Sequence, residues 1–395
     1  MPVLLSCWVE KMDFLLLLAV ATFIGTAVFG LQGFLGARRI KWLDASAPLD
    51  DACPPAVSII IPALNEEKNI RQALLSVLVL DYSPLEIIVV NDRSTDATGA
   101  ILEEISALHP QLKVMHVSEL PQGWLGKNHA MHLGAGKACG EYLLFTDADV
   151  VMEPSTLTRA MARMRAGNLD HLTLLFRAIL PSSLLQMVVI EFGVSLVSYL
   201  QPWKAADPTS DKFIGVGAFN LVRAAAYHKA GGHAAIRLCP LDDIMLGKLL
   251  KMHGFMQECL YGYHFIAVKW YGTIREMISG LRKNTFAALD YSFARLCVLT
   301  CLQLVFSIWP PWALFVTEGA TRLVNLSIFA LQGTLFVLAA LYSGIACRHV
   351  IWFPVTPYIR LYMTWKAVLA TILQQGIVWR GTFYSLRELK KGRLV

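Results

Sequence analysis

The stretch VSIIIPALNEEKNIRQALLSVLVLDYSPLEIIVVNDRSTD, residues 57–96, contains two short apolar runs on either side of a segment with helical spacing. The runs Val57–Ile61 and Glu86–Val90 are typical of buried strands. Residues 66–79 carry apolar side chains at the helical period, and residues 91–96 are rich in turn formers. Strands that alternate with helices indicate a parallel α/β sheet, which is the fold class that we predict.

The same alternation continues through the middle of the chain. Further strands are expected at residues 113–117, 141–146, 212–222 and 255–269, and a helix at residues 126–138. Gly272–Ser292 has amphipathic spacing. Pro181–Leu200 is apolar but contains Glu191, so we expect a helix that lies on a membrane surface or packs within the domain.

Two aspartates stand at the end of one predicted strand. The tripeptide Asp147-Ala148-Asp149 comes directly after the apolar run Tyr142–Thr146. Buried parallel strands deliver polar groups at their carboxyl ends. Two carboxylates at such an end suit a hard divalent cation and a substrate that carries phosphate. Because many surface loops also contain Asp-x-Asp, this motif alone is weak evidence for a site. Polar groups at the ends of the other predicted strands would strengthen it.

Polar loops follow other predicted strands as well. Pro62–Glu66 ends one strand and opens a helix, which suits a nucleotide, although a simple helix cap is the favoured alternative for this loop alone. Asp92 ends the next strand and has the same two explanations. Gly123–Lys127 forms a predicted turn that places Lys127 at the start of a helix. This lysine would either bind a diphosphate or be a solvated surface lysine.

A second acidic pair, Asp242-Asp243, begins a predicted helix, Ile244–Met252. The helix dipole alone favours acidic residues in a first turn. The functional alternative is a general base that takes a proton from an acceptor hydroxyl. Arg282 and Lys283, on the amphipathic segment, would either neutralise a leaving diphosphate or face anionic lipid headgroups.

In combination, these motifs resemble family 2 glycosyltransferases over about residues 55–290. The resemblance is carried by VSIIIPALNE (57–66), IIVVNDRSTD (87–96), DAD (147–149) and LDD (241–243). Further motifs are similar to the membrane-bound subgroup that includes ceramide glucosyltransferases and hopanoid- or carotenoid-associated glycosyltransferases. These are GWLGK (123–127), GVGAFNLVRAAAY (215–227) and GGH (231–233), together with the flanking apolar spans.

The resemblance implies a GT-A fold, a Rossmann-like nucleotide-diphospho-sugar transferase domain, and an inverting transfer of a hexose. Carried over by position, the implied donor-binding residues are Ala63, Asn65, Glu66, Asp92, Lys127, Asp147, Arg282 and Lys283. Asp92 would form a hydrogen bond with the nucleobase, which favours uridine as the nucleoside of the donor. Asp149, with Asp147 mainly on the ribose side, would hold Mg²⁺ or Mn²⁺. Asp243 matches the catalytic base.

One motif departs from the processive members of the family, which end the domain with Gln-x-x-Arg-Trp. Here the comparable region, residues 279–284, reads SGLRKN and has no Trp after its Arg. This departure argues against a processive polysaccharide synthase, the alternative enzyme. The alternative that is not an enzyme is a catalytically inactive scaffold of a lipid-synthesis complex. The presence of Asp92, Asp147, Asp149 and Asp243 argues against this alternative.

The chain is too apolar for a soluble protein, with 55% hydrophobic and only 16% charged residues. The excess lies in Phe14–Gly36, Leu296–Thr317 and Leu323–Cys347, each long enough to cross a bilayer. Residues 350–380 contain prolines and cations and suit an interfacial or re-entrant helix better. We therefore predict an integral membrane protein.

Basic residues flank the first span and fill the tail, which predicts that the catalytic part lies on the cytoplasmic face. These flanks account for most of the net charge of +6, so anionic lipid rather than nucleic acid is the expected partner surface. The expected division is an anchor at 1–42, a catalytic domain at 55–292 and a membrane region with a basic tail at 293–395. A lipid is the expected sugar acceptor. The eight cysteines show no metal or disulfide spacing.

Overall fold

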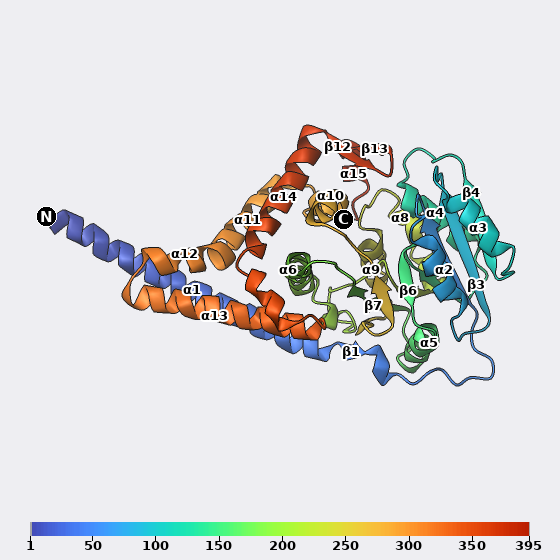
Figure 1. Cartoon of the computed structure of the whole chain (residues 1–395), viewed down its shortest axis with the longest axis horizontal. Coiled ribbons are helices and arrows are strands. Elements are labelled where there is room, and N and C mark those ends of the chain that lie inside the picture. Colours follow the sequence, from blue (N-terminus) through green and yellow to red (C-terminus); the bar gives the residue numbers. More distant parts are fainter. Residues whose placement is uncertain (1, 395) are drawn as a thin grey trace. The chain divides into compact units, whose positions relative to one another are not determined.

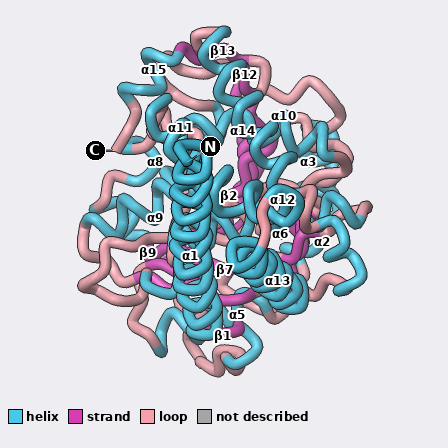
Figure 2. The backbone as a smooth tube through the Cα atoms, turned by 90° about the vertical axis from the view of Figure 1, so that its left-hand side faces the viewer, coloured by secondary structure: helices cyan, strands magenta, loops and turns pink. Residues whose placement is uncertain are grey.

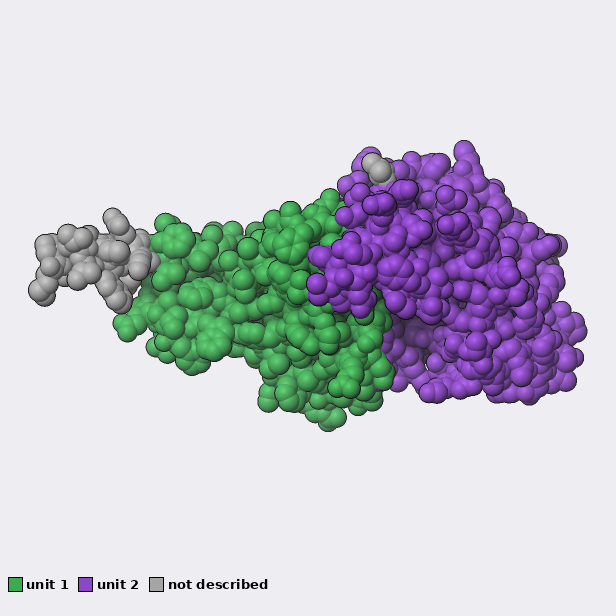
Figure 3. Space-filling view, turned by 90° about the horizontal axis from the view of Figure 1, so that it is seen from above, with its two compact units in different colours: residues 1–38, 180–199, 273–369 green, residues 39–179, 200–272, 370–395 purple. Residues whose placement is uncertain are grey.

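The computed structural model describes residues 2–394, with side chains from residue 14 onward. The chain forms two compact units, which are coloured separately in Figure 3. The helical unit comprises the residues up to Arg38, residues 180–199 and residues 273–369. The α/β unit comprises residues 39–179, residues 200–272 and the chain from Ala370 onward.

An eight-stranded sheet forms the centre of the α/β unit (Figure 1). Its spatial order is β1 (Lys41–Trp42), β10 (Gln257–Tyr261), β7 (His171–Leu175), β9 (Asn220–Arg223), β5 (Tyr142–Phe145), β2 (Val57–Ala63), β3 (Leu85–Asp92) and β4 (Leu112–Val117). Strand β9 runs antiparallel to both of its neighbours, and the other pairs are parallel. The predicted α/β class is confirmed, but the sheet is mixed rather than purely parallel.

Two smaller sheets and a set of short helices complete this unit. The strands are β6 (Val150–Met152), β8 (Arg177–Ala178) and β11 (Ile266–Val268) in one sheet, and β12 (Gly376–Trp379) and β13 (Thr382–Ser385) in a hairpin. The helices are α2 (Ile70–Leu78), α3 (Thr98–Ser106), α4 (Gly126–Lys137), α5 (Thr156–Ala166), α7 (Ala224–Lys229), α8 (Gly232–Ala235), α9 (Asp242–Met252) and α15 (Leu386–Lys391). Leu43–Ala45 and Pro202–Lys204 form 3₁₀ turns.

The structure corrects three predicted elements. The strand expected at 212–222 exists only as β9, because the glycine-rich loop before it packs against helix α9 instead of pairing. The strand expected at 255–269 is two strands in different sheets, β10 and β11. The helix expected at 66–79 begins at Ile70, because Asn65 turns the chain with a positive φ of 55°.

Apolar side chains from the sheet and from helices α4, α7 and α9 form a core cluster of the α/β unit. It includes Ile60, Leu143 and Phe145 on the strands and Met131 and Leu246 on the helices, all with almost no exposed surface. A continuous run of buried residues in β2 and β3 reflects strands covered on both faces. The carboxyl ends of these strands are thereby held in a rigid frame.

The helical unit is built from helices (Figures 1 and 2). Its elements are α1 (Pro2–Arg39), α6 (Ser183–Leu200), α10 (Ile274–Ala288), α11 (Phe293–Gln303), a π-helical turn (Leu304–Ile308), α12 (Trp309–Val316), α13 (Gly319–Tyr342), a 3₁₀ turn (Cys347–Trp352) and α14 (Thr356–Leu373). Glycines let α1 pack closely: a Cβ on Gly30 would lie 2.5 Å from a methyl group of Leu335. Small residues at such contacts are typical of helices in membranes.

Four helices are long and apolar enough to cross a membrane: Phe14–Arg39, Ser183–Lys204, Phe293–Val316 and Gly319–Tyr342. The predicted membrane association is therefore supported, and three of these helices match the predicted spans. Helix α14 is not among the four, and its placement as an interfacial or re-entrant segment stays a prediction.

Helix α6 has the composition of a span but cannot make a single crossing. Strand β7 precedes it and strand β9 follows it, and these two strands pair directly, with His171 opposite Val222. A single crossing would place the two paired strands on opposite sides of the bilayer. Of the two predicted placements, the structure rejects packing within the α/β domain, because Met187 and Ile190 of α6 pack against Phe336 of α13 in the helical unit.

Some polar groups inside the helical unit are paired with groups on neighbouring helices. Glu191 of α6 forms an ion pair with Arg360 of α14, with 2.8 Å between Oε1 and Nε. Prolines at 310 and 311 deprive the Phe306 carbonyl of the backbone donors that an α- or π-helix would supply. The side chain of Gln332 on α13 donates to that carbonyl instead. Satisfying such groups internally is what a membrane environment requires.

Candidate nucleotide-sugar site

The candidate site lies where strands β2, β3 and β5 end and helices α4 and α9 begin. A hydrogen bond of 2.8 Å from Thr146 Oγ1 to the Ala218 carbonyl ties the end of β5 to the loop before β9. Asp147 follows at once on β5, while Lys127 stands in the first turn of α4. Chain segments that are distant in sequence therefore bring charged side chains together at one edge of the sheet.

Lys127 joins two of the predicted acidic motifs. Its Nζ lies 2.7 Å from Asp147 Oδ1 and 3.0 Å from Asp242 Oδ2. The side chains of Lys127 and Asp242 are only 9% and 5% exposed, whereas Asp147 is 38% exposed. Burial disfavours the charged amine, but the attraction of Asp147 and Asp242 outweighs it and raises the pKa of Lys127. Lys127 is thus a buried cation rather than a solvated surface lysine.

Asp243 has a different environment from its neighbour Asp242. Its Oδ2 accepts a hydrogen bond of 2.8 Å from the Gly217 backbone N–H, and its Oδ1 accepts one of 2.8 Å from the Ile244 N–H. Burial, with the nearby charge of Asp242, raises the pKa of Asp243 to about 6, against the lowering effect of Lys127. A carboxylate with such a pKa suits general base catalysis near neutral pH.

Glycines allow the loop before β9 to approach helix α9. A Cβ on Gly215 would lie 1.8 Å from the Asp243 carbonyl oxygen, and one on Gly247 would lie 2.0 Å from the Ile214 carbonyl oxygen. A Cβ on Gly217 would lie 2.8 Å from Asp147 Oδ2 and 3.4 Å from Asp243 Oδ2. Gly217 therefore lies between the two carboxylates, and the three glycines set the position of the predicted base.

Asp149 is the predicted metal ligand, and its surroundings are acidic. Burial, Asp147 and Glu66 together raise the pKa of Asp149 to about 7. Burial, and after it the charges of Asp149 and Asp147, raise the pKa of Tyr271 to about 12. A concentration of negative charge in a buried place favours a bound cation, and carboxylate oxygens are the ligands that Mg²⁺ and Mn²⁺ prefer.

The described residues contain no group of three or more His, Cys, Asp or Glu side chains arranged to hold a metal ion. A cation at Asp149 and Asp147 would therefore take its remaining ligands from water and from a phosphate-bearing substrate. Mg²⁺ in nucleotide enzymes is commonly held in this way, by one or two carboxylates and substrate phosphates. The two carboxylates therefore fit a metal ion whose remaining coordination positions are filled by a diphosphate and water.

Asp92 ends β3 as predicted, but its carboxylate already has a partner. The neighbouring Arg93 donates to Asp92 Oδ1 from Nε at 2.7 Å and to Oδ2 from Nη2 at 3.0 Å. The Asp92 side chain has no exposed surface. A Cβ on Gly126 would lie 2.4 Å from Asp92 Oδ2, so the start of α4 presses against this pair.

The first loop of the site is held by its own polar side chains. Asn65 Oδ1 accepts a hydrogen bond of 2.8 Å from the Thr95 N–H, and the Asn65 N–H donates to Ser94 Oγ at 3.0 Å. Ala63 at the end of β2 is fully buried. Glu66 lies close enough to Asp147 and Asp149 to interact with both charges. Through its hydrogen bonds with Thr95 and Ser94, Asn65 connects the loop after β2 to the loop after β3.

The sequence-based prediction missed a contribution from the chain's end. Tyr384 of β13 lies with its hydroxyl 3.4 Å from the Gly126 N–H, and Arg93 Nη1 donates to Thr382 Oγ1 at 3.3 Å. Glu66 interacts with the charge of Arg380. A sequence signal was present: residues 376–385 (GIVWRGTFYS) place β-branched and aromatic residues on both sides of an Arg-Gly pair, which is typical of a hairpin.

Arg282 and Lys283 lie on α10 in the helical unit, away in sequence from the other predicted residues. The remaining predicted residues all belong to the α/β unit: Ala63, Asn65, Glu66, Asp92, Lys127, Asp147, Asp149 and Asp243. The donor role of Arg282 and Lys283 stays a prediction.

A mixed α/β sheet with polar loops and an Asp-x-Asp motif at its strand ends is the architecture of GT-A glycosyltransferases. Residues 58–229 match the family described as "Glycosyl transferase family 2", so this part of the chain is a family 2 glycosyltransferase domain. The resemblance found in the sequence motifs is thereby confirmed.

Two relatives extend the comparison. An uncharacterized glycosyltransferase of Haemophilus influenzae is 35% identical over 119 residues, which cover 30% of this chain and 35% of that protein. The 4,4′-diaponeurosporenoate glycosyltransferase of Staphylococcus aureus is 27% identical over 226 residues, 55% of this chain and 56% of that protein. The chain thus spans about half or less of the length of these relatives.

Among solved structures, the fold is similar to mannosyltransferase PcManGT from Pyrobaculum calidifontis, whose structure was determined in complex with GDP-Man and Mn²⁺. The TM-score is 0.54 at 18% sequence identity, and the match covers 91% of this chain and 99% of that chain. At this identity the similarity concerns the fold.

Proposed function

We propose that this protein transfers a hexose from a nucleotide-diphosphate sugar to a hydroxyl group of a membrane lipid, with inversion at the anomeric carbon. The observation that carries this proposal is the convergence of Lys127, Asp147, Asp149 and Asp243 at one edge of the sheet in a family 2 domain. Such a site combines acidic groups for a metal-bound diphosphate with a separate carboxylate for proton transfer.

In the proposed reaction, Asp243 takes the proton of the acceptor hydroxyl. The oxygen then forms a bond to the anomeric carbon from the face opposite the diphosphate, whose bond to that carbon breaks. The backbone N–H groups of Gly217 and Ile244 orient the Asp243 carboxylate. Asp242 is paired with Lys127 and is almost fully buried, so it leaves the base role to Asp243.

Asp149 and Asp147 would hold the divalent cation, which supplies neutralisation of the charge that develops on the departing diphosphate. The mannosyltransferase with a similar fold binds GDP-Man and Mn²⁺. Lys127 fixes the orientation of Asp147 through the ion pair of 2.7 Å between its Nζ and Asp147 Oδ1. Asp92 would accept a hydrogen bond from the nucleobase of the donor. This requires that Arg93 give up one of its two hydrogen bonds to Asp92.

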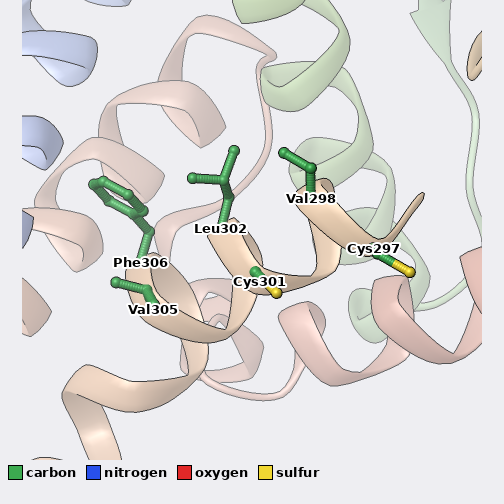
Figure 4. A pocket seen from close by; sticks show the side chains of 6 residues that line it. All are labelled: Cys297, Val298, Cys301, Leu302, Val305 and Phe306. Atoms are coloured by element: carbon green, nitrogen blue, oxygen red, sulfur yellow. The ribbon is translucent and has the colours of Figure 1, made fainter. Parts of the chain in front are cut away.

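The lipid acceptor is proposed from the relative that acts on a diaponeurosporenoate and from the membrane-type helices. An apolar hollow in the helical unit supports it: Figure 4 shows Val298, Leu302 and Phe306 projecting from one side of the helix that carries Cys297 and Cys301. The basic residues Arg38 and Arg39 at the end of the first helix, and Lys41 after it, favour a cytoplasmic position for the α/β unit.

The test is to incubate membranes that contain the full chain with labelled UDP- and GDP-sugars and to identify labelled lipids by mass spectrometry. One added hexose on a lipid is the expected product. Asp243→Asn should abolish transfer while sparing donor binding, and Asp211→Asn, at a side chain that is 89% exposed, is the matched control. A long polymer, or transfer by the Asp243→Asn variant at the wild-type rate, would contradict the proposal.

A further inference from the structure

The hairpin formed by β12 and β13 ends in an unusual two-residue turn. Arg380 and Gly381 connect the paired residues Trp379 and Thr382, and both have positive φ, 50° and 76°. This is the backbone of a type I′ turn, in which the first position strongly favours Asn, Asp or Gly. A long side chain in the left-handed region is disfavoured, so the fold holds Arg380 there against its backbone preference.

The hairpin is fixed to the candidate site near its tip, and the chain after the hairpin is fixed to the α/β unit. Near the tip, Thr382 accepts a hydrogen bond from Arg93, the partner of Asp92. On the other side, the segment after the hairpin packs on the α/β unit: Cys239 Sγ donates to the Gly392 carbonyl, and Lys248 Nζ donates to the Leu394 carbonyl at 2.9 Å. The tip is therefore held in place rather than free in solvent.

The charge of Arg380 is directed at the acidic part of the site. Burial raises the pKa of the Glu66 carboxyl, and the charge of Arg380 is the largest influence that lowers it. Glu66 in turn interacts with Asp147 and Asp149, the proposed cation ligands. Arg380 Nη1 is buried and has no hydrogen-bond partner. A buried guanidinium nitrogen without a partner has donors left for a ligand.

We propose that Arg380, delivered by the tip of the C-terminal hairpin, binds the diphosphate of the nucleotide donor. The guanidinium has a geometry that matches phosphate oxygens with two parallel hydrogen bonds. The inference rests on the proposed function, and it assigns a binding role to a segment outside the matched family region.

The test measures binding of UDP and GDP, each with Mn²⁺, to the purified full chain by calorimetry. Arg380→Asn places a preferred residue in the turn and removes the guanidinium, so thermal stability should stay the same or rise. Affinity for the nucleoside diphosphate should fall about tenfold or more, because charge-assisted hydrogen bonds to phosphate are lost. Arg380→Lys keeps the charge and should show a smaller loss.

Uridine and guanosine, which lack the diphosphate, are the matched ligands, and their binding should be the same in wild type and Arg380→Asn. Equal affinity of the wild type and the Arg380→Asn variant for UDP and GDP would overturn the assignment of Arg380 alone. An equal loss for the bare nucleosides would also overturn it, because the hairpin would then act by shaping the whole pocket. Wild-type protein that binds neither diphosphate would overturn the proposed function itself, together with this assignment.

Discussion

Asp242 and Asp243 are neighbours in one helix turn, yet the fold gives them different chemistry. Asp242 lies in an ion pair with Lys127, with 3.0 Å between the charged atoms, and is nearly inaccessible. Asp243 instead accepts two backbone N–H groups, and burial raises its pKa. One residue therefore stabilises the site and the other is suited to proton transfer, a distinction that depends on which loop each side chain meets.

The ion pair should be visible in stability. Lys127→Met removes the cation that pairs with the buried carboxylate of Asp242, which should lower the free energy of unfolding by about 3 kcal/mol. Thermal melting of the purified protein measures this loss. Lys127→Met combined with Asp242→Asn should recover most of it, and Lys137→Met, at an exposed lysine of the same helix, should have little effect. A wild-type melting curve for Lys127→Met would contradict the pairing.

The acidic pH dependence follows from two raised pKa values. In the proposed mechanism Asp149 must be ionised to bind a cation and Asp243 to accept a proton, and the pKa values of these two carboxyls are raised to about 7 and about 6. Because a raised pKa leaves the carboxyl protonated below it, kcat/KM should fall below about pH 7 and more steeply below about pH 6. Transfer rates measured from pH 5 to pH 8 test this. A flat profile down to pH 5 would be inconsistent with both roles.

At the scale of elements, the contact between the loop at 214–217 and helix α9 positions the base. Gly215 and Gly247 occupy places where even a methyl group would overlap backbone atoms. The loop carries the Gly217 N–H that bonds Asp243, so a shift of the helix relative to the loop changes the orientation of that carboxylate. Close backbone packing is thus part of the site.

Two glycines in helices provide a matched test of this contact. Gly247→Ala should clash with the Ile214 carbonyl, lowering both thermal stability and the transfer rate. Gly136→Ala, on α4 with no atom within 4 Å of the added methyl group, should stabilise the protein slightly through helix propensity. Melting curves and transfer assays of both variants distinguish the effects. Equal behaviour of the two variants would show that the contact does not matter.

At the scale of the whole molecule, the chain passes between the two units several times. Residues 180–199 leave the α/β unit after β8, contribute α6 to the helical unit, and return before β9. Because β7 and β9 pair in one sheet, both ends of α6 must lie on the same side of a bilayer. The Glu191–Arg360 pair neutralises the charge that α6 carries into the helical unit.

The topology of α6 can be tested by labelling. In a variant without other cysteines, Cys139 before α6 and a cysteine at Asp211→Cys after it are both exposed positions. An impermeant maleimide added to sealed vesicles should label both sites or neither. Labelling from opposite sides would require that α6 cross the membrane. Labelling only in vesicles that expose the cytoplasmic face would support the proposed orientation.

The sequence by itself determined the strand ends that carry Asp92 and Asp147, because buried strands and polar turns are local patterns of hydrophobicity. It also determined the membrane-type helices, because length and composition alone decide whether a segment can span. The tertiary structure alone decided that Lys127 meets both Asp147 and Asp242, that β9 runs antiparallel, and that the hairpin around Arg380 reaches Glu66. Such contacts join segments far apart in the chain, and they depend on packing and loop closure, which no local periodicity encodes.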